Sequence, residues 1–540
     1  MSDDPLPQAD NEVVAKGDRQ KRLLEQVRKE WGKPLERERN FGLIRLFHRW
    51  SKATASVDDS TWGDLAMDEV FAAIDRTRSV TGQQVLYHEL RTGLAGPVLL
   101  AERARQQDIL RDDASLRERL QLLLEQLNRP GAEYVAPLLL GGMPDKPRLA
   151  WLYRSLAVAS MGCLVATGFF HWMVVPVLVL LLVNVAISAT YGQRILPHFT
   201  GFASINTLLG VAAEVAKLPD RHALPQLGAL RQSAPLIAGL RKRLGWLVAD
   251  RSAMPEMTQW LFGYLNMMFL FDVLIFLRSL KILREKQSQL VGIFEALGSL
   301  DASIAVASYV SGLPVFCRPE LVETRRLEVT GIYHPLIPNA VDNPLSLTDR
   351  GALIAGPNMA GKTAFIRTIG INLILAQTLD LCLARRAILP RAVVRSAIRR
   401  EDKLSEGSSY FYSEIKQVQE FTQLGAGGPL HVILIDEIFR GTNTIERIAS
   451  SAAVLRHLAR TQIVLATTHD SELQALLGDV FAMYHFSDQV VNGTYGFDYH
   501  ICTGPVRSRN AIKLLALSGY AKEITDEAER LAAQLEPRPG

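Results

Sequence analysis

Residues 353–370, LIAGPNMAGKTAFIRTIG, decide the fold class of the second half of this 540-residue chain. They fit the spacing G-x-x-x-x-G-K-[ST] with Gly356, Gly361, Lys362 and Thr363, between a short apolar run and a helical run. Such a loop surrounds phosphates with backbone N–H groups at a helix N-terminus, and its glycines allow close approach. The lysine would reach the β and γ phosphates, and the threonine would ligate Mg2+. The stretch therefore predicts a strand, loop and helix that bind ATP and Mg2+.

Two apolar runs downstream end in polar residues. HVILIDE ends in Asp436 and Glu437, and QIVLATTHD places His469 directly after its apolar part. Asp436 can hold the metal through water, and Glu437 can polarise the attacking water. His469 can hydrogen-bond the γ-phosphate or that water, although a purely structural role is the alternative. With Lys362, these residues form the predicted catalytic set of an α/β ATPase domain.

Further motifs separate the branches of ABC-type ATPases. The LSGGQ-like signature of transporters is missing, and the chain shows GPNMAGKT, EGSSYFYSEIKQVQE, DEIFRGTNTIE and ATTHDSEL in this order. In order and spacing these resemble the ATPase domain of the MutS family, with its GPNMGGKS, G-x-S-T-F-x-x-E-M, DE-x-x-RGT-[SN]-T and ATH. LEVTGIYHPLI and SRNAIKLLALSGYAKEITDEAERL resemble the start and the closing helices of that domain. DEVFAAIDRTRSVTGQQVLYHELRTG and YVSGLPVFCRPEL resemble, more weakly, the two ends of the family's helical core domain.

The resemblance implies roles for individual residues. It implies that the phosphate loop binds ATP through nine consecutive positions: Gly356, Pro357, Asn358, Met359, Ala360, Gly361, Lys362, Thr363 and Ala364. It also implies that Thr363 and Asp436 hold Mg2+.

The resemblance further implies a nucleotide site shared between two subunits. Ser409 would address the nucleotide of the opposite subunit, and Asn443 would lie in the loop that crosses between subunits, so a homodimer is expected. The alternative for Ser409 is that it only caps the helix that follows it. Ala360 and Phe439 stand where the family usually has glycine, which leaves the coupling between subunits open.

An apolar segment interrupts the helical half. Residues 155–191 contain no Asp, Glu, Lys or Arg, and their last 20 residues match a hydrocarbon core of about 30 Å at about 1.5 Å per residue. Basic residues on both sides, including Arg154 and Arg194, place both flanks in the cytoplasm. We therefore expect a transmembrane hairpin over residues 146–194, with a buried soluble hairpin as the alternative. A second apolar stretch, residues 260–277, contains Asn266 and Asp272 and is predicted to be a buried helix.

Composition adds little about partners. The net charge is +4 with 21% charged residues, and the four cysteines form no CxxC pair, which argues against a zinc site and a disulfide framework. Basic residues gather near position 395 and would suit DNA phosphates, or form an ordinary solvated face: Arg385, Arg386, Arg391, Arg395, Arg399, Arg400 and Lys403. The mismatch-reading module that precedes the family's core domain is not expected here.

The predicted fold class is α plus α/β, in four parts. We expect a polar N-terminal tail (1–45), a helical lever domain (46–145 and 195–325), the transmembrane hairpin (146–194), and an ABC-type P-loop ATPase domain (326–540). The expected function is an ATP-hydrolysing switch in the inner, cytoplasmic membrane, with the ATPase facing the cytoplasm. The resemblance implies binding of mismatched or branched DNA in DNA repair, and the alternative is action on a protein partner.

Overall fold

The computed structural model describes residues 8–51, 57–141, 150–245, 256–357, 359–398, 410–424, 427–439, 442–491, 494–506, 515 and 519–535. The chain divides into two compact units that interleave in sequence. Unit 1 comprises Met1–Ala53, Ile74–Glu89 and Arg105–Gly312, and unit 2 comprises Thr54–Ala73, Leu90–Ala104 and Leu313–Gly540. The predicted order, a helical region followed by an α/β region with mixed sheets, is confirmed.

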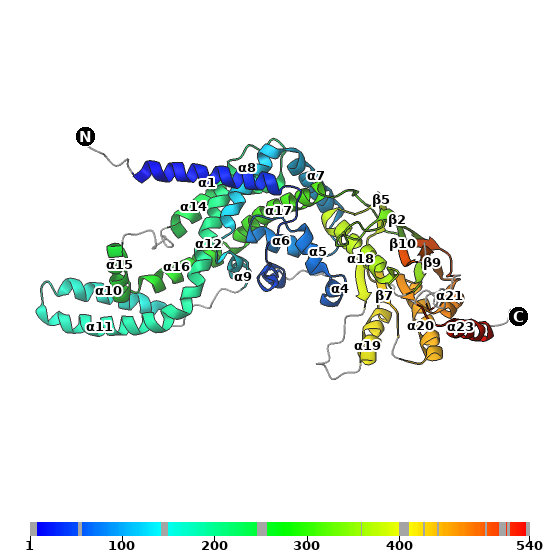
Figure 1. Ribbon diagram of the computed structural model, residues 1–540. Helices are drawn as coiled ribbons and strands as arrows, with labels where there is room; N and C mark the ends of the chain where they lie inside the picture. Colours follow the sequence, from blue (N-terminus) through cyan, green and yellow to red (C-terminus); the bar gives the residue numbers. More distant parts are fainter. Residues whose placement is uncertain are drawn as a thin grey trace. The chain divides into compact units, whose positions relative to one another are not determined.

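Unit 1 is built from helices (Figure 1). Its α-helices are α1 (Gln8–Glu30), α2 (Phe41–Ile44), α3 (Leu46–Trp50), α6 (Val80–Arg91), α7 (Pro97–Asp112), α8 (Ala114–Leu124), α9 (Val135–Leu140), α10 (Ala150–Ala166), α11 (Val174–Ile187), α12 (Gln193–Ala216), α13 (Pro225–Gln232), α14 (Ala234–Gly245), α15 (Glu256–Phe269), α16 (Phe271–Glu285) and α17 (Gln287–Ser311). Short helical turns are η1 (Glu125–Leu127), η2 (Ala132–Tyr134), η3 (His171–Met173) and the π-helical η4 (Ser188–Gly192). The C-terminal end of α6 and the N-terminal half of α7 belong to unit 2.

Helix α17 is the centre of the unit 1 core. It packs against α8, α9, α13 and α16, and 17 of its 25 residues are buried. Its carboxylate Asp301 is fully buried and accepts hydrogen bonds from the backbone N–H groups of Arg78 and Ser79 at 3.0 Å and 2.8 Å. The start of α6 is thus fixed to the middle of α17 by a buried polar contact, in which every donor has an acceptor.

The segment expected to be a polar tail contains helix α1. Val27 is buried on it, and Arg28 forms a two-pronged ion pair with Glu118 of α8 at 2.8 Å. The Arg117 guanidinium lies 3.8 Å from the ring centroid of Trp31, just after the helix. Charged residues dominate this segment, but one apolar position per few turns suffices to dock its end on α8.

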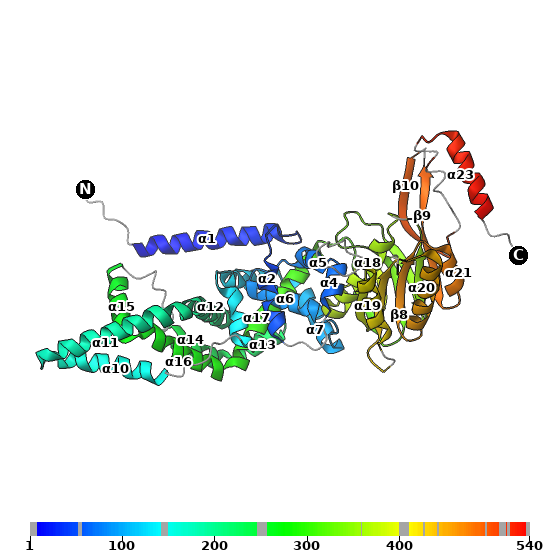
Figure 2. The ribbon, with the colours of Figure 1, turned by 90° about the horizontal axis from the view of Figure 1, so that it is seen from below.

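The apolar segment forms a helical hairpin, α10 and α11, with α15 packed against both helices (Figures 1 and 2). Among the described residues, two helical segments pass a test of length and apolar composition for crossing a membrane: His171–Thr190, whose most apolar 18-residue window is 6% buried, and Gln287–Ser311, whose corresponding window is 78% buried. The second apolar stretch, residues 260–277, was predicted to be one buried helix, and this prediction is wrong. Leu270, with a φ of +54°, separates α15, which exposes apolar side chains, from the largely buried α16.

Unit 2 contains two sheets flanked by helices. Its strands are β1 (Glu320–Val322), β2 (Arg326–Ile332), β3 (Asn343–Thr348), β4 (Gly351–Ala355), β5 (Arg386–Pro390), β6 (Val393–Ala397), β7 (His431–Asp436), β8 (Ile463–Thr468), β9 (Phe481–Val491) and β10 (Thr494–Thr503). Its helices are α4 (Asp59–Asp64), α5 (Met67–Ile74), α18 (Lys362–Leu379), α19 (Tyr410–Thr422), α20 (Thr444–Ala459), α21 (Ser471–Leu477) and α23 (Lys522–Leu535).

The larger sheet positions the site. Its order is β10-β9-β4-β8-β7-β6, parallel except for the β9–β10 hairpin, and the smaller sheet has the order β1-β5-β2-β3. Strands β4, β7 and β8 are buried along nearly their whole length, which explains their continuous apolar runs. Helix α20 packs against β8, and α21 packs against α20 (Figure 2).

Helix α4 and most of α5 belong to unit 2, although the sequence assigned them to the helical lever. The Asp64 carboxylate accepts hydrogen bonds from Ser396 Oγ at 2.7 Å and from the Ile398 backbone N–H at 2.9 Å. Asp58 forms an ion pair with Arg395 of β6. Helical periodicity is the same in either unit, so the pattern of these helices held no information about which sheet or bundle they join.

Candidate active site

The loop between β4 and α18 has the backbone of a phosphate-binding loop. Gly356 and Gly361 adopt φ values of +143° and +100°, which favour glycine. A Cβ atom on Gly356 would lie 2.6 Å from the carbonyl oxygen of Phe486. Gly361 is the N-cap of α18, so the N-terminal N–H groups of this long helix face the loop.

The Lys362 ammonium is held inside this loop. Its Nζ donates hydrogen bonds to the carbonyl oxygens of Gly356 at 2.6 Å and of Pro357 at 3.1 Å, and lies 3.7 Å from Glu437 Oε1. The side chain is 4% exposed. A buried ammonium with carbonyl and carboxylate partners is positioned to neutralise the charge of a phosphate bound in this loop.

Strand order brings the acidic residues to the loop. Because β4, β8 and β7 are adjacent and parallel, their carboxyl ends meet at one edge of the sheet. Asp436 ends β7, and its Oδ2 accepts a hydrogen bond from Thr363 Oγ1 at 2.9 Å. Its other oxygen accepts from Thr467 of β8. The predicted metal ligands Thr363 and Asp436 are therefore in direct contact.

This pair fits Mg2+ by the chemistry of its donors. A hydroxyl and a carboxylate offer hard oxygen ligands at a helix N-terminus, where phosphate oxygens complete the coordination of Mg2+ in nucleotide sites. Bound there, Mg2+ would supply charge neutralisation between the phosphates, and Thr363 and Asp436 would hold it.

Glu437 and His469, two of the predicted catalytic residues, lie side by side at the site. Glu437 Oε1 lies 3.6 Å from His469 Nδ1, and its side chain is largely buried. The Glu437 backbone has a φ of +50°, and its N–H donates to Thr467 Oγ1 at 3.2 Å. The neighbouring Asp470 is fixed by Arg447 through two hydrogen bonds of 2.8 Å and 3.1 Å. Glu437, the carboxylate expected to polarise water, thus lies between the Lys362 ammonium and the His469 imidazole.

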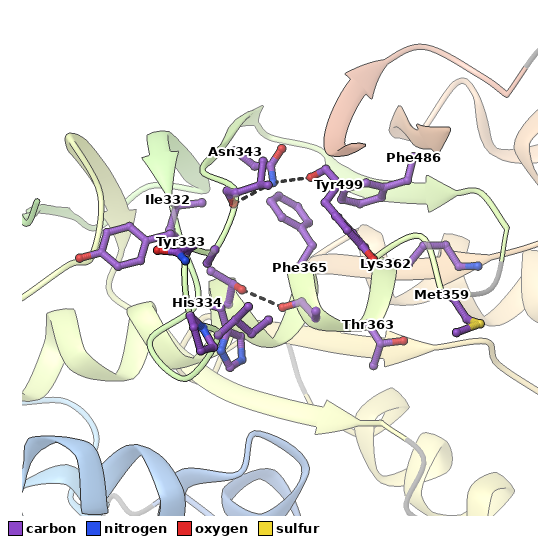
Figure 3. Close-up of a pocket in the computed structure, with 18 of the residues that line it drawn as sticks. Ile332, Tyr333, His334, Asn343, Met359, Lys362, Thr363, Phe365, Phe486 and Tyr499 are labelled. Carbon is purple, nitrogen blue, oxygen red and sulfur yellow. Dashed lines mark hydrogen bonds between the residues drawn. The ribbon is translucent and has the colours of Figure 1, made fainter. Parts of the chain in front are cut away.

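A cavity of about 540 Å³ adjoins the phosphate loop (Figure 3). Its wall combines aromatic and apolar side chains with the catalytic residues, among them Tyr333, Phe365, Phe486, Tyr499, Lys362 and Glu437. Asn343 connects two of its walls, because its Nδ2 donates to the Tyr499 carbonyl at 3.0 Å and its Oδ1 accepts from the Ile501 N–H at 2.8 Å. An aromatic cavity beside a phosphate loop suits a nucleoside base.

His334 enters this cavity as a neutral side chain. Burial and the nearby Arg367 guanidinium lower the pKa of His334 to about 4. Its Nδ1 accepts a hydrogen bond from the Leu336 N–H at 3.2 Å, so its other ring nitrogen carries the proton. The motif LEVTGIYHPLI was interpreted only as a family resemblance, and no site role was predicted for His334 or Tyr333.

Comparison with known proteins identifies the family of the C-terminal part of unit 2. Residues 352–536 match the family model for MutS domain V. These residues form a MutS domain V ATPase. The chain is 30% identical over 237 residues to the DNA mismatch repair protein MutS of Shouchella clausii, covering 42% of this chain and 27% of that protein. It is 37% identical over 186 residues to the Endonuclease MutS2 of Thermus thermophilus, covering 34% of this chain and 24% of the relative.

The similarity to known proteins is partial in length. A third relative, the DNA mismatch repair protein MutS of Halalkalibacterium halodurans, is 32% identical over 273 residues, which is 47% of this chain and 31% of the relative. The chain thus spans about a quarter to a third of the length of these curated relatives. The predicted resemblance of the ATPase domain is confirmed, whereas the weaker resemblance of the helical half stays a prediction.

Other predicted residues of the MutS domain V ATPase have local roles. Asn443 is the N-cap of α20, and its side chain accepts a hydrogen bond from the Glu446 N–H at 3.0 Å. Ser409 directly precedes α19, but Ser409 and Asn358 lie outside the described residues. Met359 is exposed with a φ of +70°, and Ala360 is buried. A role for Asn443 or Ser409 between subunits remains a prediction.

Glu414 is a site residue that the sequence interpretation missed. It lies on α19, and its Oε1 accepts a hydrogen bond from the Phe439 N–H at 2.7 Å. Phe439, which stands where the family usually has glycine, has a φ of +61° and a buried side chain. The contact joins α19 to the loop after Glu437. The acidic position of the family's G-x-S-T-F-x-x-E-M motif was the signal that could have revealed it.

Proposed function

We propose that the chain is an ATP-driven switch associated with a membrane. The ATPase supplies nucleotide binding and hydrolysis, and the helical unit supplies attachment through the hairpin α10–α11. The observation that carries the membrane part is the segment His171–Thr190, which has a mean hydropathy of 2.4 and is only 6% buried. Apolar surface left in water on this scale is costly, and a lipid environment removes that cost.

Localisation follows from the flanks of the hairpin. Arg154 precedes the charge-free segment and Arg194 follows it, and basic flanks stay on the cytoplasmic side. We therefore propose the cytoplasmic membrane, with the ATPase in the cytoplasm, where ATP is available.

Within the ATPase, we assign one role to each residue. Lys362 neutralises the phosphates, Thr363 and Asp436 hold Mg2+, Glu437 polarises water, and His469 orients Glu437 or the water. The resemblance supports a homodimer in which Ser409 and Asn443 reach the partner's nucleotide. Hydrolysis then resets the switch, as in other phosphate-held switches.

Two targets of the switch are compatible with this assignment. The relatives' names, DNA mismatch repair protein MutS and Endonuclease MutS2, support DNA as one target. Within the predicted basic cluster, however, Arg385 pairs with Asp342 at 2.6 Å and Arg391 with Glu323 at 3.1 Å. Arg395 pairs with Asp58. Arg399, Arg400 and Lys403 of the cluster lie outside the described residues. Because three of its seven charges are already compensated, we favour a protein target and keep mismatched or branched DNA as the second candidate.

Vesicle flotation combined with an ATPase assay tests the main proposal. The full chain should float with vesicles of phosphatidylethanolamine and phosphatidylglycerol and hydrolyse ATP. Lys362→Ala should lower turnover by more than about tenfold, and Glu437→Gln should retain ATP binding while losing turnover. Both variants should float as the native chain does. A chain that stays in the soluble fraction would contradict membrane association.

A titration of the detergent-solubilised protein separates the two targets. Paired, mispaired and four-way DNA are compared at several salt concentrations, with and without ATP. Binding through phosphates weakens steeply with salt. Salt-dependent, structure-selective binding would establish DNA as the target, and absence of binding to all three at low salt would leave the protein target.

A further inference from the structure

The base of the hairpin belongs to the core of unit 1. Tyr153 and Leu156 of α10 and Ile187 of α11 pack against the main apolar cluster of that unit. Ala157 and Ser160 are also buried. These residues are therefore covered at least in part by protein, and we take the hairpin beyond them as the part that is available to a membrane.

The available part is short. It comprises residues 158–166 of α10 and residues 174–185 of α11, joined by the turn that contains η3, and the buried side chains within it are Ser160 and Asn184. At about 1.5 Å per residue, these helical pieces are about 12 Å and about 17 Å long, against a hydrocarbon thickness of about 30 Å. Composition alone suggested a span, because it counted the turn at residues 171–173 and residues 186–190 together with this piece of α11.

The tip of the hairpin is aromatic. Phe169, Phe170 and Trp172 are exposed there, and the turn carries no charged residue. A tip that reached the water on the far side of a bilayer would hold these rings in water, whereas a tip that ends inside the bilayer keeps them in an apolar medium.

Helix α15 provides the second element. It runs across the direction of α10 and α11 in both views (Figures 1 and 2). It is attached where the buried Asn184 Nδ2 donates to the Met268 carbonyl at 2.6 Å and to Ser160 Oγ at 2.9 Å. Its exposed face carries Met257, Trp260, Tyr264, Leu265 and Met267. A helix of this kind, with Trp and Tyr on its exposed face, is typical of the membrane interface.

Basic side chains lie on α10 and on a helix that packs against it. Arg154 is exposed at the start of α10, and Arg278 and Lys281 are exposed on α16, which packs against α10. Exposed cations next to an apolar insertion suit anionic lipid headgroups.

We propose that the hairpin enters a single leaflet of the bilayer and that α15 lies in the interface beside it, so that the chain is monotopic rather than membrane-spanning. The inference rests on the proposed membrane association and specifies its geometry. The occupant of the exposed apolar surface is thus one lipid leaflet with anionic headgroups.

Thiol accessibility in vesicles tests the depth of the tip. The full-length His171→Cys variant is added to preformed phosphatidylethanolamine and phosphatidylglycerol vesicles, with a membrane-impermeant maleimide either outside or trapped inside. Labelled peptides are mapped by mass spectrometry, and the exposed Cys502 of unit 2 serves as the outside control. We expect Cys502 to react from outside, and position 171 to react from neither side until detergent is added.

The other outcomes discriminate. Reaction of position 171 with the trapped reagent would show a spanning hairpin and overturn the one-leaflet geometry while preserving membrane association. Reaction from outside in floated vesicles would show that the tip is not inserted. Failure to float ends the proposed membrane association itself, and a detergent-free oligomer that does not float would identify a second copy as the occupant.

A matched pair of exposed residues tests α15. Met257 and Val98 are each 84% exposed, but Met257 lies on α15 and Val98 on α7 in unit 2. Met257→Glu combined with Trp260→Glu should reduce the fraction bound at limiting lipid by about tenfold, because two charges enter the interface. Val98→Glu should leave binding unchanged. Equal binding of the double variant and the control would overturn the interfacial position of α15.

Discussion

Helices α11 and α17 pass the same test of length and apolar composition but lie in opposite environments. The most apolar 18-residue window of the segment around α11, His171–Thr190, has a mean hydropathy of 2.4 and is 6% buried, whereas that of α17, Gln287–Ser311, has a mean hydropathy of 1.6 and is 78% buried. Both belong to unit 1. Apolar composition therefore shows that a helix must leave water, and its neighbours decide whether protein or another apolar medium receives it.

The two helices differ in how specific their surroundings are. Helix α17 carries Gly298, which allows close approach of Val85, and Asp301, which has matched hydrogen-bond donors. Helix α11 exposes large aliphatic side chains such as Leu182, and its one buried polar residue is Asn184. A protein interior requires this complementarity, whereas lipid requires only apolar surface.

The largest expected effect comes from placing a charge on each helix. Leu297 of α17 is fully buried, so Leu297→Asp should prevent folding of unit 1, because an unpaired carboxylate in the core costs several kcal/mol, about the whole stability of a domain. Leu182→Asp on α11 should leave the unfolding midpoint in detergent unchanged but abolish flotation. Circular dichroism melting and vesicle flotation check the pair. Equal loss of fold in both variants would show that α11 is a core helix as well.

A pH titration examines the buried acid of α17. Burial raises the pKa of Asp301 to about 6, against its ordinary value of 3.8, although hydrogen bonds from Ser79 and Arg78 oppose the shift. Because the folded state then binds the proton more tightly than the unfolded state, the stability due to this group is greatest below pH 4 and is lost as pH rises through about 6. The difference in unfolding free energy between the native chain and Asp301→Asn should change by up to about 3 kcal/mol over this range. Denaturant titrations at pH 4.5 and 7.5 measure it, and a difference that is independent of pH would contradict the buried-acid assignment.

Two glycines give a smaller, matched comparison. A Cβ on Gly298 of α17 would lie 2.3 Å from Val85 Cγ2 and 3.1 Å from the Thr81 carbonyl oxygen, whereas a Cβ on Gly162 of α10 would meet nothing within 4 Å. Gly298→Ala should destabilise unit 1 by about 2 kcal/mol through overpacking. Gly162→Ala should stabilise its helix by up to about 1 kcal/mol. Thermal melting distinguishes the two, and the same sign for both would show that the α6–α17 contact is looser than the structure indicates.

The smallest expected effect concerns Asn184. Asn184→Ala removes two hydrogen bonds, to Ser160 and to the Met268 carbonyl, and should cost about 1 kcal/mol each at most. The main change should appear as faster amide hydrogen exchange in α15, with exchange in α17 unchanged. Protection of α15 that equals the native level would mean that apolar packing alone holds it on the hairpin.

The features that could be predicted from the amino-acid sequence are those whose geometry is local. The phosphate loop was predictable because Gly356, Gly361, Lys362 and Thr363 act within one strand, turn and helix. The acids after β7 and the histidine after β8 were predictable because parallel strands expose their carboxyl ends at one edge, and the structure brings Asp436, Glu437 and His469 to that edge.

The contacts between residues distant in sequence depend on how the folded chain packs and could not be predicted. Tyr499, Asn343 and His334 enter one cavity from separate strands and loops, and Glu414 reaches Phe439 from another helix. Likewise, the apolar stretch at residues 260–277 became an exposed α15 and a buried α16, and α4 joined unit 2. Periodicity states which face of a helix avoids water, but the partner of that face depends on packing between segments far apart in the chain, which no local pattern contains.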